Sequence, residues 1–197
     1  MNFQLLEKIS SILSSQNNYY SLFFSYSMNL KEKISEYQDF PKKGILFRDF
    51  SPILNDPAAM SFVVEEFSKK FHPKDVDVFV GIESRGFITA SILAQKYNKG
   101  MVMLRKAGKL PGKTVEISYT IEYGKAVLEI QKNVLKKGER VVICDDLLAT
   151  GGTAKAGAKL VEKIGAKVAG FAFIIELTDL NGIKEINNYK TVSLVQY

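Results

Sequence analysis

Short apolar runs separated by amphipathic stretches form the main pattern of this chain. Residues 141–144 are apolar without a break, a run too short for a helix and suited to a strand buried on both faces. Further strands are predicted at 76–82, 100–104, 168–176 and 192–195. Because helical patterns lie between these runs, the sequence predicts an α/β domain with a mainly parallel central sheet flanked by helices.

Several helices have clear sequence signals. Asp56 followed by Pro57 is typical of a helix N-cap with proline in the first turn. A second helix is predicted to end at about Tyr97, and a third to begin directly after Thr153. Residues 31–37 are predicted to form a short helix near the start of the folded region.

Two segments between strands are expected to differ from this pattern. Residues 105–113 combine several cations with Gly and Pro, so we expect a loop without regular structure that moves to close over an anion. Residues 118–121 and 126–130 lie on either side of Glu122 and are predicted to form either a hairpin or an extended flap.

Composition excludes several functions. With 197 residues, 46% hydrophobic and 24% charged, the chain has the size and composition of one globular domain, and no apolar run approaches the length of a membrane span. The single Cys144 excludes an internal disulfide and a cysteine metal cluster, and the single His72 argues against histidine-based metal or triad chemistry. We therefore expect a cytoplasmic protein that does not act at a membrane.

The net charge is +6, from 27 basic and 21 acidic residues. Lys-Lys pairs at 42–43, 69–70 and 136–137 are spread along the chain rather than gathered on one helix. This excess is compatible with a polyphosphate substrate and is only a weak sign of nucleic-acid binding. We expect no nucleic-acid partner.

The segment 141–153 carries the most specific chemical signal. Its strand is followed by Asp145 and Asp146, and then by the run 149–153, which reads Ala-Thr-Gly-Gly-Thr. Ligands bind at the carboxyl ends of strands in open α/β sheets, and amides at a helix N-terminus favour phosphate. The run is not a Walker A loop, because no Lys-Ser/Thr pair follows its glycines, and it lacks the dinucleotide-binding glycine spacing.

This segment resembles the phosphoribosyl-diphosphate (PRPP) binding motif of the type I phosphoribosyltransferases. From about residue 29 to Tyr197 the order of motifs is similar to that of the family members that act on adenine. The matching motifs are at 39–41, 47–49, 84–87, 105–106, 108–112, 122–125, 128–131 and 176–178. The resemblance implies a type I phosphoribosyltransferase fold over 28–197, with a small base-binding hood and a mobile flap.

Residues 1–27 differ from the rest of the chain, being rich in Ser, Asn, Tyr and Phe with one Lys and no Arg. A secretory signal or a transit peptide is disfavoured by this composition. We interpret the segment as an N-terminal extension that is non-catalytic, arising either from a start codon read too early or from a species-specific addition.

The resemblance implies transfer of ribose 5-phosphate from PRPP to N9 of adenine, giving AMP and pyrophosphate, with Mg²⁺ as a helper. Asp145 and Asp146 are expected to hold the ribose hydroxyls directly or through hydrated Mg²⁺, with the metal otherwise bound by substrate and water. The 5′-phosphate site is expected to consist of Ala149, Thr150, Gly151, Gly152 and Thr153.

The same resemblance predicts where pyrophosphate binds. Ser84 and Arg85 lie on the loop that the family uses for this group, and Arg85 is a candidate catalytic residue. A strained Ser84–Arg85 peptide bond is implied, for which the cis form is one option. Arg105, Lys106 and Lys109 are the expected flap cations. In the family the flap arginine commonly reaches a neighbouring subunit, which implies a homodimer.

Base selection depends on Ala149 and Glu122. Family members that act on oxopurines carry Asp at the position of Ala149, where it meets purine N7. Ala149 cannot exchange a proton, so adenine is implied, with Glu122 on the flap as the catalytic acid. The adenine site is expected to consist of Leu46, Phe47, Arg48 and Leu180.

Two other functions are alternatives to this one. A transferase for another purine base is disfavoured by Ala149. A PRPP-binding regulator without turnover is disfavoured by Glu122 and by the flap cations.

Overall fold

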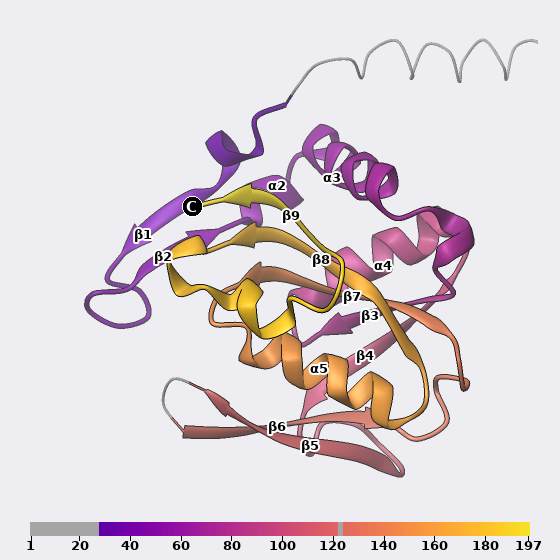
Figure 1. Ribbon diagram of the computed structural model, residues 1–197. Coiled ribbons are helices and arrows are strands. Elements are labelled where there is room, and N and C mark those ends of the chain that lie inside the picture. The colour runs from indigo at the N-terminus through magenta and orange to yellow at the C-terminus, as the bar shows by residue number, and fades with distance from the viewer. Residues whose placement is uncertain (1–27, 122–123) are drawn as a thin grey trace, which may run out of the picture.

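A seven-stranded sheet forms the centre of the fold, and the computed structural model describes residues 28–121 and 124–197. The strand order is β5-β6-β4-β3-β7-β8-β9 (Figure 1). The strands are β3 (Val78–Ile82), β4 (Gly100–Lys106), β5 (Thr114–Ile121), β6 (Gly124–Gln131), β7 (Arg140–Leu148), β8 (Lys167–Glu176) and β9 (Thr191–Gln196). Since β3, β4, β7, β8 and β9 are parallel, the predicted mainly parallel α/β sheet is confirmed.

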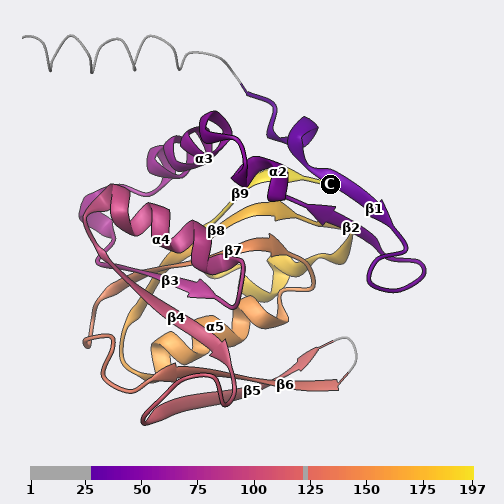
Figure 2. The ribbon, with the colours of Figure 1, turned by 180° about the vertical axis from the view of Figure 1, so that it is seen from behind.

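Helices cover both faces of this sheet. On one face lie α3 (Pro57–Lys70) and α4 (Gly86–Tyr97), and on the other lies α5 (Gly152–Lys163) (Figures 1 and 2). Alternate residues of β7 point to opposite faces, so that Val142 packs with the α3 and α4 side chains and Ile143 with those of α5. Because β7 is buried on both faces, its apolar residues contribute to two cores at once.

The predicted helix boundaries are confirmed where they rest on capping and turn signals. Asp56 Oδ1 accepts hydrogen bonds from the amides of Ala58 (2.9 Å) and Ala59 (3.2 Å), and Pro57 begins α3. The second helix ends at Tyr97, as predicted, and is followed by Asn98 in the left-handed conformation (φ 53°).

A small two-stranded sheet lies beside the main one and forms the predicted hood. It pairs β1 (Ser35–Gln38) with β2 (Leu46–Asp49) in antiparallel register. The prediction of a helix over 31–37 is wrong beyond Lys33, where a short 3-10 helix η1 (Leu30–Lys33) ends. Pairing with β2 supplies the hydrogen bonds that a helix would otherwise have made, so tertiary context overrides the local pattern.

The β5–β6 pair is an antiparallel hairpin, which decides between the two alternatives given for this segment. The expectation of an irregular segment from 105 is wrong for its first two residues, because β4 continues through Lys106 and pairs with β6. The remaining short helices are α2 (Ser51–Leu54), η2 (Pro73–Asp75), η3 (Thr178–Leu180) and η4 (Gly182–Ile186). No helix in the described ranges has the length and apolar character needed to cross a membrane.

Candidate active site

The loop between β7 and α5 forms a small cradle at the carboxyl end of the sheet. Gly151 has a φ of 81°, and a Cβ on it would collide with the main-chain oxygen of Gly182 in η4. A Cβ on Gly182 would in turn collide with the oxygen of Ala149. The turn into α5 therefore requires both glycines, and it brings the amides of the loop to the helix N-terminus, where anions are favoured.

The structure brings most of the predicted phosphate-binding residues together. A cavity of about 90 Å³ is lined by Asp145, Leu147, Leu148, Ala149, Thr150, Gly151, Thr153, Ala154 and Phe173. Gly152, the first residue of α5, lies within the same turn. Thr153 Oγ1 is 3.5 Å from the Tyr119 hydroxyl, which links the β5–β6 hairpin to this turn.

Asp145 and Asp146 lie near the end of β7, which extends two residues beyond them to Leu148. Asp146 is 5% exposed, and its Oδ2 is 2.8 Å from Arg85 Nη2. The Asp146 amide donates to Asp145 Oδ1 at 2.9 Å. Burial and the neighbouring Asp146 charge hold the pKa of Asp145 well above its usual range. Burial also raises the pKa of Asp146, although the Arg85 guanidinium opposes the shift.

The loop at residues 83–86 places Arg85 against this acid pair. A Cβ on Gly86 would collide with the main-chain oxygen of Cys144, so only glycine allows the loop to approach β7 this closely. The cis peptide bond is Glu83–Ser84, one bond before the Ser84–Arg85 bond named from the sequence, which corrects that expectation. Ser84 is exposed at the tip of the loop.

Glu83 gathers the predicted flap cations, a role that sequence reasoning missed. Its side chain is 8% exposed; it accepts from Arg105 Nε at 3.2 Å and from the Lys106 amide at 3.0 Å, and it pairs with Lys109 Nζ. Burial alone would raise the pKa of Glu83, but the hydrogen bonds from Lys109, Lys106 and Arg105 outweigh it and lower the pKa. Lys106 takes part through its amide rather than its ammonium group.

Glu129 is a second acid that the sequence reasoning did not single out. It is 2% exposed, and its Oε1 accepts from the amides of Lys109 and Leu110, both at 2.8 Å. Burial would raise the pKa of Glu129, and these backbone hydrogen bonds more than reverse that shift. The sequence signal for this role was a single acidic residue between the apolar Leu128 and Ile130. The hydrogen bonds that Glu129 accepts anchor loop 107–113 at its middle.

The predicted base site is divided between two elements. Leu46, Phe47 and Arg48 lie on β2, whereas Leu180 lies on η3 and is 44% exposed. The Arg85 guanidinium carbon is 5.2 Å from the Phe47 ring centroid, so the hood lies next to the predicted pyrophosphate loop. Glu122, the expected catalytic acid, lies outside the described residues.

Comparison with known proteins agrees with the family resemblance of the motifs. The phosphoribosyl transferase domain family matches residues 53–196. The chain is 71% identical over 170 residues to a protein of Nitrosopumilus maritimus named adenine phosphoribosyltransferase, covering 86% of this chain and 100% of that protein. The chain belongs to the adenine phosphoribosyltransferase family. A second adenine phosphoribosyltransferase, from Cenarchaeum symbiosum, is 56% identical over the same shares of the two chains.

Solved adenine phosphoribosyltransferases have the same fold. The crystal structure from Thermoanaerobacter pseudethanolicus matches with a TM-score of 0.82 and 44% identity, over 85% of this chain and 98% of that one. The Trypanosoma brucei enzyme, solved with AMP, pyrophosphate and ribose-5-phosphate, matches with a TM-score of 0.76 and 28% identity, over 85% and 77%. The type I phosphoribosyltransferase fold expected from the motifs is thereby confirmed.

Proposed function

We propose that this protein is an adenine phosphoribosyltransferase that makes AMP and pyrophosphate from adenine and PRPP in purine salvage. In this reaction the bond from C1′ to the pyrophosphate oxygen breaks, with its electron pair leaving on pyrophosphate, and a bond from C1′ to adenine N9 forms. The observation that carries the proposal is the meeting of a phosphate cradle, an acid pair and a cation cluster at one end of the sheet.

The β7–α5 turn is the proposed site of the 5′-phosphate. Amides at a helix N-terminus offer unpaired donors and a favourable dipole to an anion. The hydroxyls of Thr150 and Thr153 supply two more donors beside them. Ala149 opens the same turn and leaves room for a purine without offering an acid.

Asp145 and Asp146 are proposed to hold the ribose hydroxyls. Two neighbouring buried carboxylates with raised pKa values gain from hydroxyl donors or from a cation. Negative charge at this point also favours the positive charge that develops at C1′.

Mg²⁺ fits the same acid pair. Phosphoribosyltransferases generally use Mg²⁺ with PRPP. In the described ranges no group of three or more His, Cys, Asp or Glu side chains is placed to hold a metal, which agrees with a Mg²⁺ bound mainly by substrate oxygens and water beside the two carboxylates. Bound there, Mg²⁺ would neutralise diphosphate charge, and Asp145 and Asp146 would hold it.

The departing pyrophosphate is proposed to meet Ser84, Arg85, Arg105, Lys106 and Lys109. Arg85 is 36% exposed beside Asp146, so part of its guanidinium can reach a phosphate oxygen while the ion pair persists. Arg105 and Lys109 are held by Glu83 close to the same loop.

We also propose a homodimer in the cytoplasm, residues 28–197 as the catalytic domain, and 1–27 as a non-catalytic extension.

Adenine is proposed to stack on Phe47, with Leu180 over its other face and the main chain of Leu46 and Arg48 reading the amino edge. Glu122 is proposed as the acid at N7. The β5–β6 hairpin contacts the phosphate turn through Tyr119 and Thr153, and Glu122 lies between these two strands in the sequence, which supports the proposal.

Nucleotide formation with single purines tests the proposal. Protein, PRPP and Mg²⁺ are incubated with adenine, hypoxanthine or guanine, and each nucleotide is measured by chromatography. AMP is expected from adenine, with far slower reaction of the oxopurines. If hypoxanthine or guanine reacts and adenine does not, the assignment of adenine as the substrate is wrong. If PRPP binds and no purine reacts, the PRPP-binding regulator is favoured.

A further inference from the structure

Two cations lie over the ring of Tyr197, the residue that follows β9. Lys31 Nζ is 4.1 Å from the ring centroid, and the Arg48 guanidinium carbon is 3.9 Å from it. A cation over an aromatic face is attracted by the ring quadrupole. The ring therefore joins η1, which carries Lys31, to the hood strand β2, which carries Arg48.

Arg48 depends on this ring because it has few other partners. Its side chain is 17% exposed, and its Nε is buried without a hydrogen-bond acceptor in the described chain. Glu36 Oε1, on the paired strand β1, is 3.4 Å from that nitrogen, a distance of an ion pair rather than a close hydrogen bond. Removing the ring would leave a half-covered guanidinium at the base of the hood.

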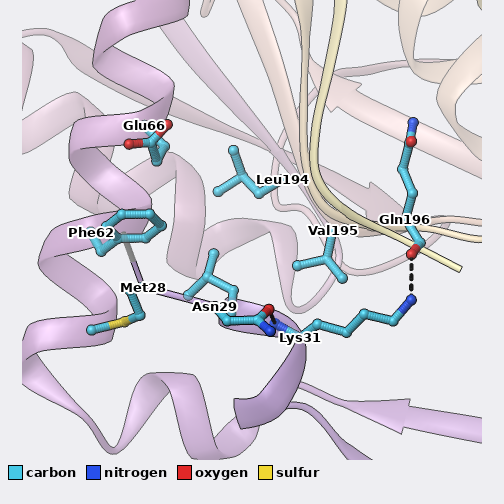
Figure 3. A pocket seen from close by; sticks show the side chains of 9 residues that line it. Met28, Asn29, Lys31, Phe62, Glu66, Leu194, Val195 and Gln196 are labelled. Carbon is cyan, nitrogen blue, oxygen red and sulfur yellow. Dashed lines mark hydrogen bonds between the residues drawn. The ribbon is translucent and has the colours of Figure 1, made fainter. Parts of the chain in front are cut away.

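Lys31 is itself tied to the end of β9. Its Nζ donates to the main-chain oxygen of Gln196 at 2.9 Å, across a pocket of about 300 Å³ between η1, α3 and β9 (Figure 3). The ammonium group thus contacts both the main chain before Tyr197 and the Tyr197 ring. These contacts fix where the ring lies.

The main chain of Tyr197 is attached to the other half of the base site. Its amide donates to the Glu176 oxygen at 3.0 Å, and its oxygen accepts from the Thr178 amide at 2.8 Å and from the Thr178 hydroxyl. Thr178 begins η3, the short helix that carries Leu180. One residue therefore contacts both β2, with Phe47, and η3, with Leu180.

We propose that Tyr197 is a positioning residue for the purine, because its ring contacts Arg48 of β2 while its main chain is hydrogen-bonded to Thr178 of η3. The inference rests on the proposed function, which defines Phe47 and Leu180 as the two walls of the base site. Tyr197 acts through these walls. Its loss should therefore affect the use of adenine more than that of PRPP, because Tyr197 contacts β2 and η3, whereas the proposed PRPP residues lie on β7, α5, the loop at residues 83–86 and the segment from Arg105 to Lys109.

Steady-state kinetics of Tyr197→Ala and Tyr197→Phe, with adenine and PRPP varied in turn, test this division. Small misplacement of a substrate site costs one to two orders of magnitude, so Tyr197→Ala should raise the KM for adenine about tenfold and the KM for PRPP less than about twofold. Tyr197→Phe keeps the ring and should stay within about threefold of the wild type for adenine.

Tyr189→Ala is the matched control. Tyr189 is also half-buried and precedes β9, with its ring 5.6 Å from Phe171 and its hydroxyl donating to Glu162 at 2.8 Å. Its removal should lower the melting temperature and leave both KM values unchanged. If Tyr197→Ala is insoluble, Lys31→Met decides the question, with an expected rise of about threefold in the KM for adenine.

Three results would overturn the proposal: an unchanged KM for adenine in Tyr197→Ala, or in Lys31→Met where that variant decides; equal increases for both substrates in Tyr197→Ala; or Tyr197→Phe as impaired as the alanine variant. The wild-type protein in the same assay reports on the proposed function separately. If the wild type forms no AMP from adenine, the proposed function is wrong. If it forms AMP and the Tyr197 variants have unchanged KM values, only the inference about Tyr197 is wrong.

Discussion

Two pairs of carboxylates, each largely shielded from solvent, lie at the same end of the sheet, and their surroundings differ. Glu83 and Glu129 are almost fully covered, and each is paired with cations or amides of loop 107–113 or its neighbours. Asp146 is buried to a similar degree, whereas Asp145 is half-buried, and Arg85 is the one cation paired with either aspartate in the described chain. The pKa is lowered in the first pair and raised in the second.

This contrast separates anchoring from binding. A buried charge that the protein itself pairs stabilises the arrangement around it, and removing either partner leaves an uncompensated group. A buried charge that the protein leaves short of partners costs stability until a ligand supplies them. We therefore interpret the glutamates as fixed supports of the cation loop, and the aspartates as groups kept ready for ribose hydroxyls and Mg²⁺.

The largest expected effect comes from neutralising the aspartates. Asp145→Asn and Asp146→Asn should each lower kcat by about 100-fold or more, because charge placed for the transition state is lost while the shape is kept. Rates of AMP formation at saturating substrates measure this. Asp77→Asn, which removes an acid of the Asp77–Arg140 pair where β7 begins, is the control and should keep its turnover.

Next comes removal of the loop anchor. Glu129→Ala leaves the amides of Lys109 and Leu110 without the carboxylate that accepts from them and should cost about 2–3 kcal/mol of unfolding free energy. Denaturant unfolding checks this value. Glu129→Gln keeps an acceptor oxygen and should lose less than the alanine variant; a Gln variant as unstable as Ala would show that the charge, not the hydrogen bonds, holds the loop.

A smaller effect is expected at Glu83. Glu83→Gln removes one negative charge from the region, which by itself would strengthen pyrophosphate binding. If Glu83 serves to hold Arg105 and Lys109 in place, pyrophosphate inhibition should instead weaken, by about fivefold. The inhibition constant of pyrophosphate, measured in competition with PRPP, decides between stronger and weaker binding. Tighter inhibition in Glu83→Gln would show that Glu83 competes with pyrophosphate for the cations.

The smallest effect is an acid dependence of stability. Hydrogen bonds from Arg140 lower the pKa of Asp77 from 3.8 to about 2. A lowered folded-state pKa gives stability that is present above the unfolded pKa and is lost as pH falls toward the folded one. As the pH falls from 3.8 to about 2, the free energy of unfolding of the wild type should thus decline more steeply than that of Asp77→Asn. Equal slopes would contradict this.

The comparison also shows what could be predicted from the sequence. The phosphate turn was predictable because the residues from Ala149 to Thr153 are contiguous and their conformation is local. Glu83 and Glu129 acquire their roles through pairing between distant segments: β3, which Glu83 follows, pairs with β4, and β4 pairs with β6, in which Glu129 lies opposite Arg105. Short-range sequence patterns do not indicate which distant strands pair.

The errors have the same origin. The helix expected at 31–37 gave way to β1 because β2, whose paired residues lie 8 to 14 positions later, supplies partners for its backbone. The cis bond was assigned to the wrong side of Ser84, since a tripeptide motif does not specify which peptide bond is inverted. Tyr197 had no signal at all, because its cations come from η1 and β2.

The stability of Asp145→Asn across pH tests the central contrast most directly. A raised folded-state pKa means that the Asp145 carboxyl lowers the free energy of unfolding at pH values above its unfolded-state pKa, and that this penalty shrinks as pH falls toward the unfolded-state pKa. We predict that Asp145→Asn unfolds at a higher denaturant concentration than the wild type at pH 7.5, and that the difference narrows steadily toward acid. A variant less stable than the wild type at pH 7.5 would show that Asp145 is an anchor like the glutamates, and would contradict the account.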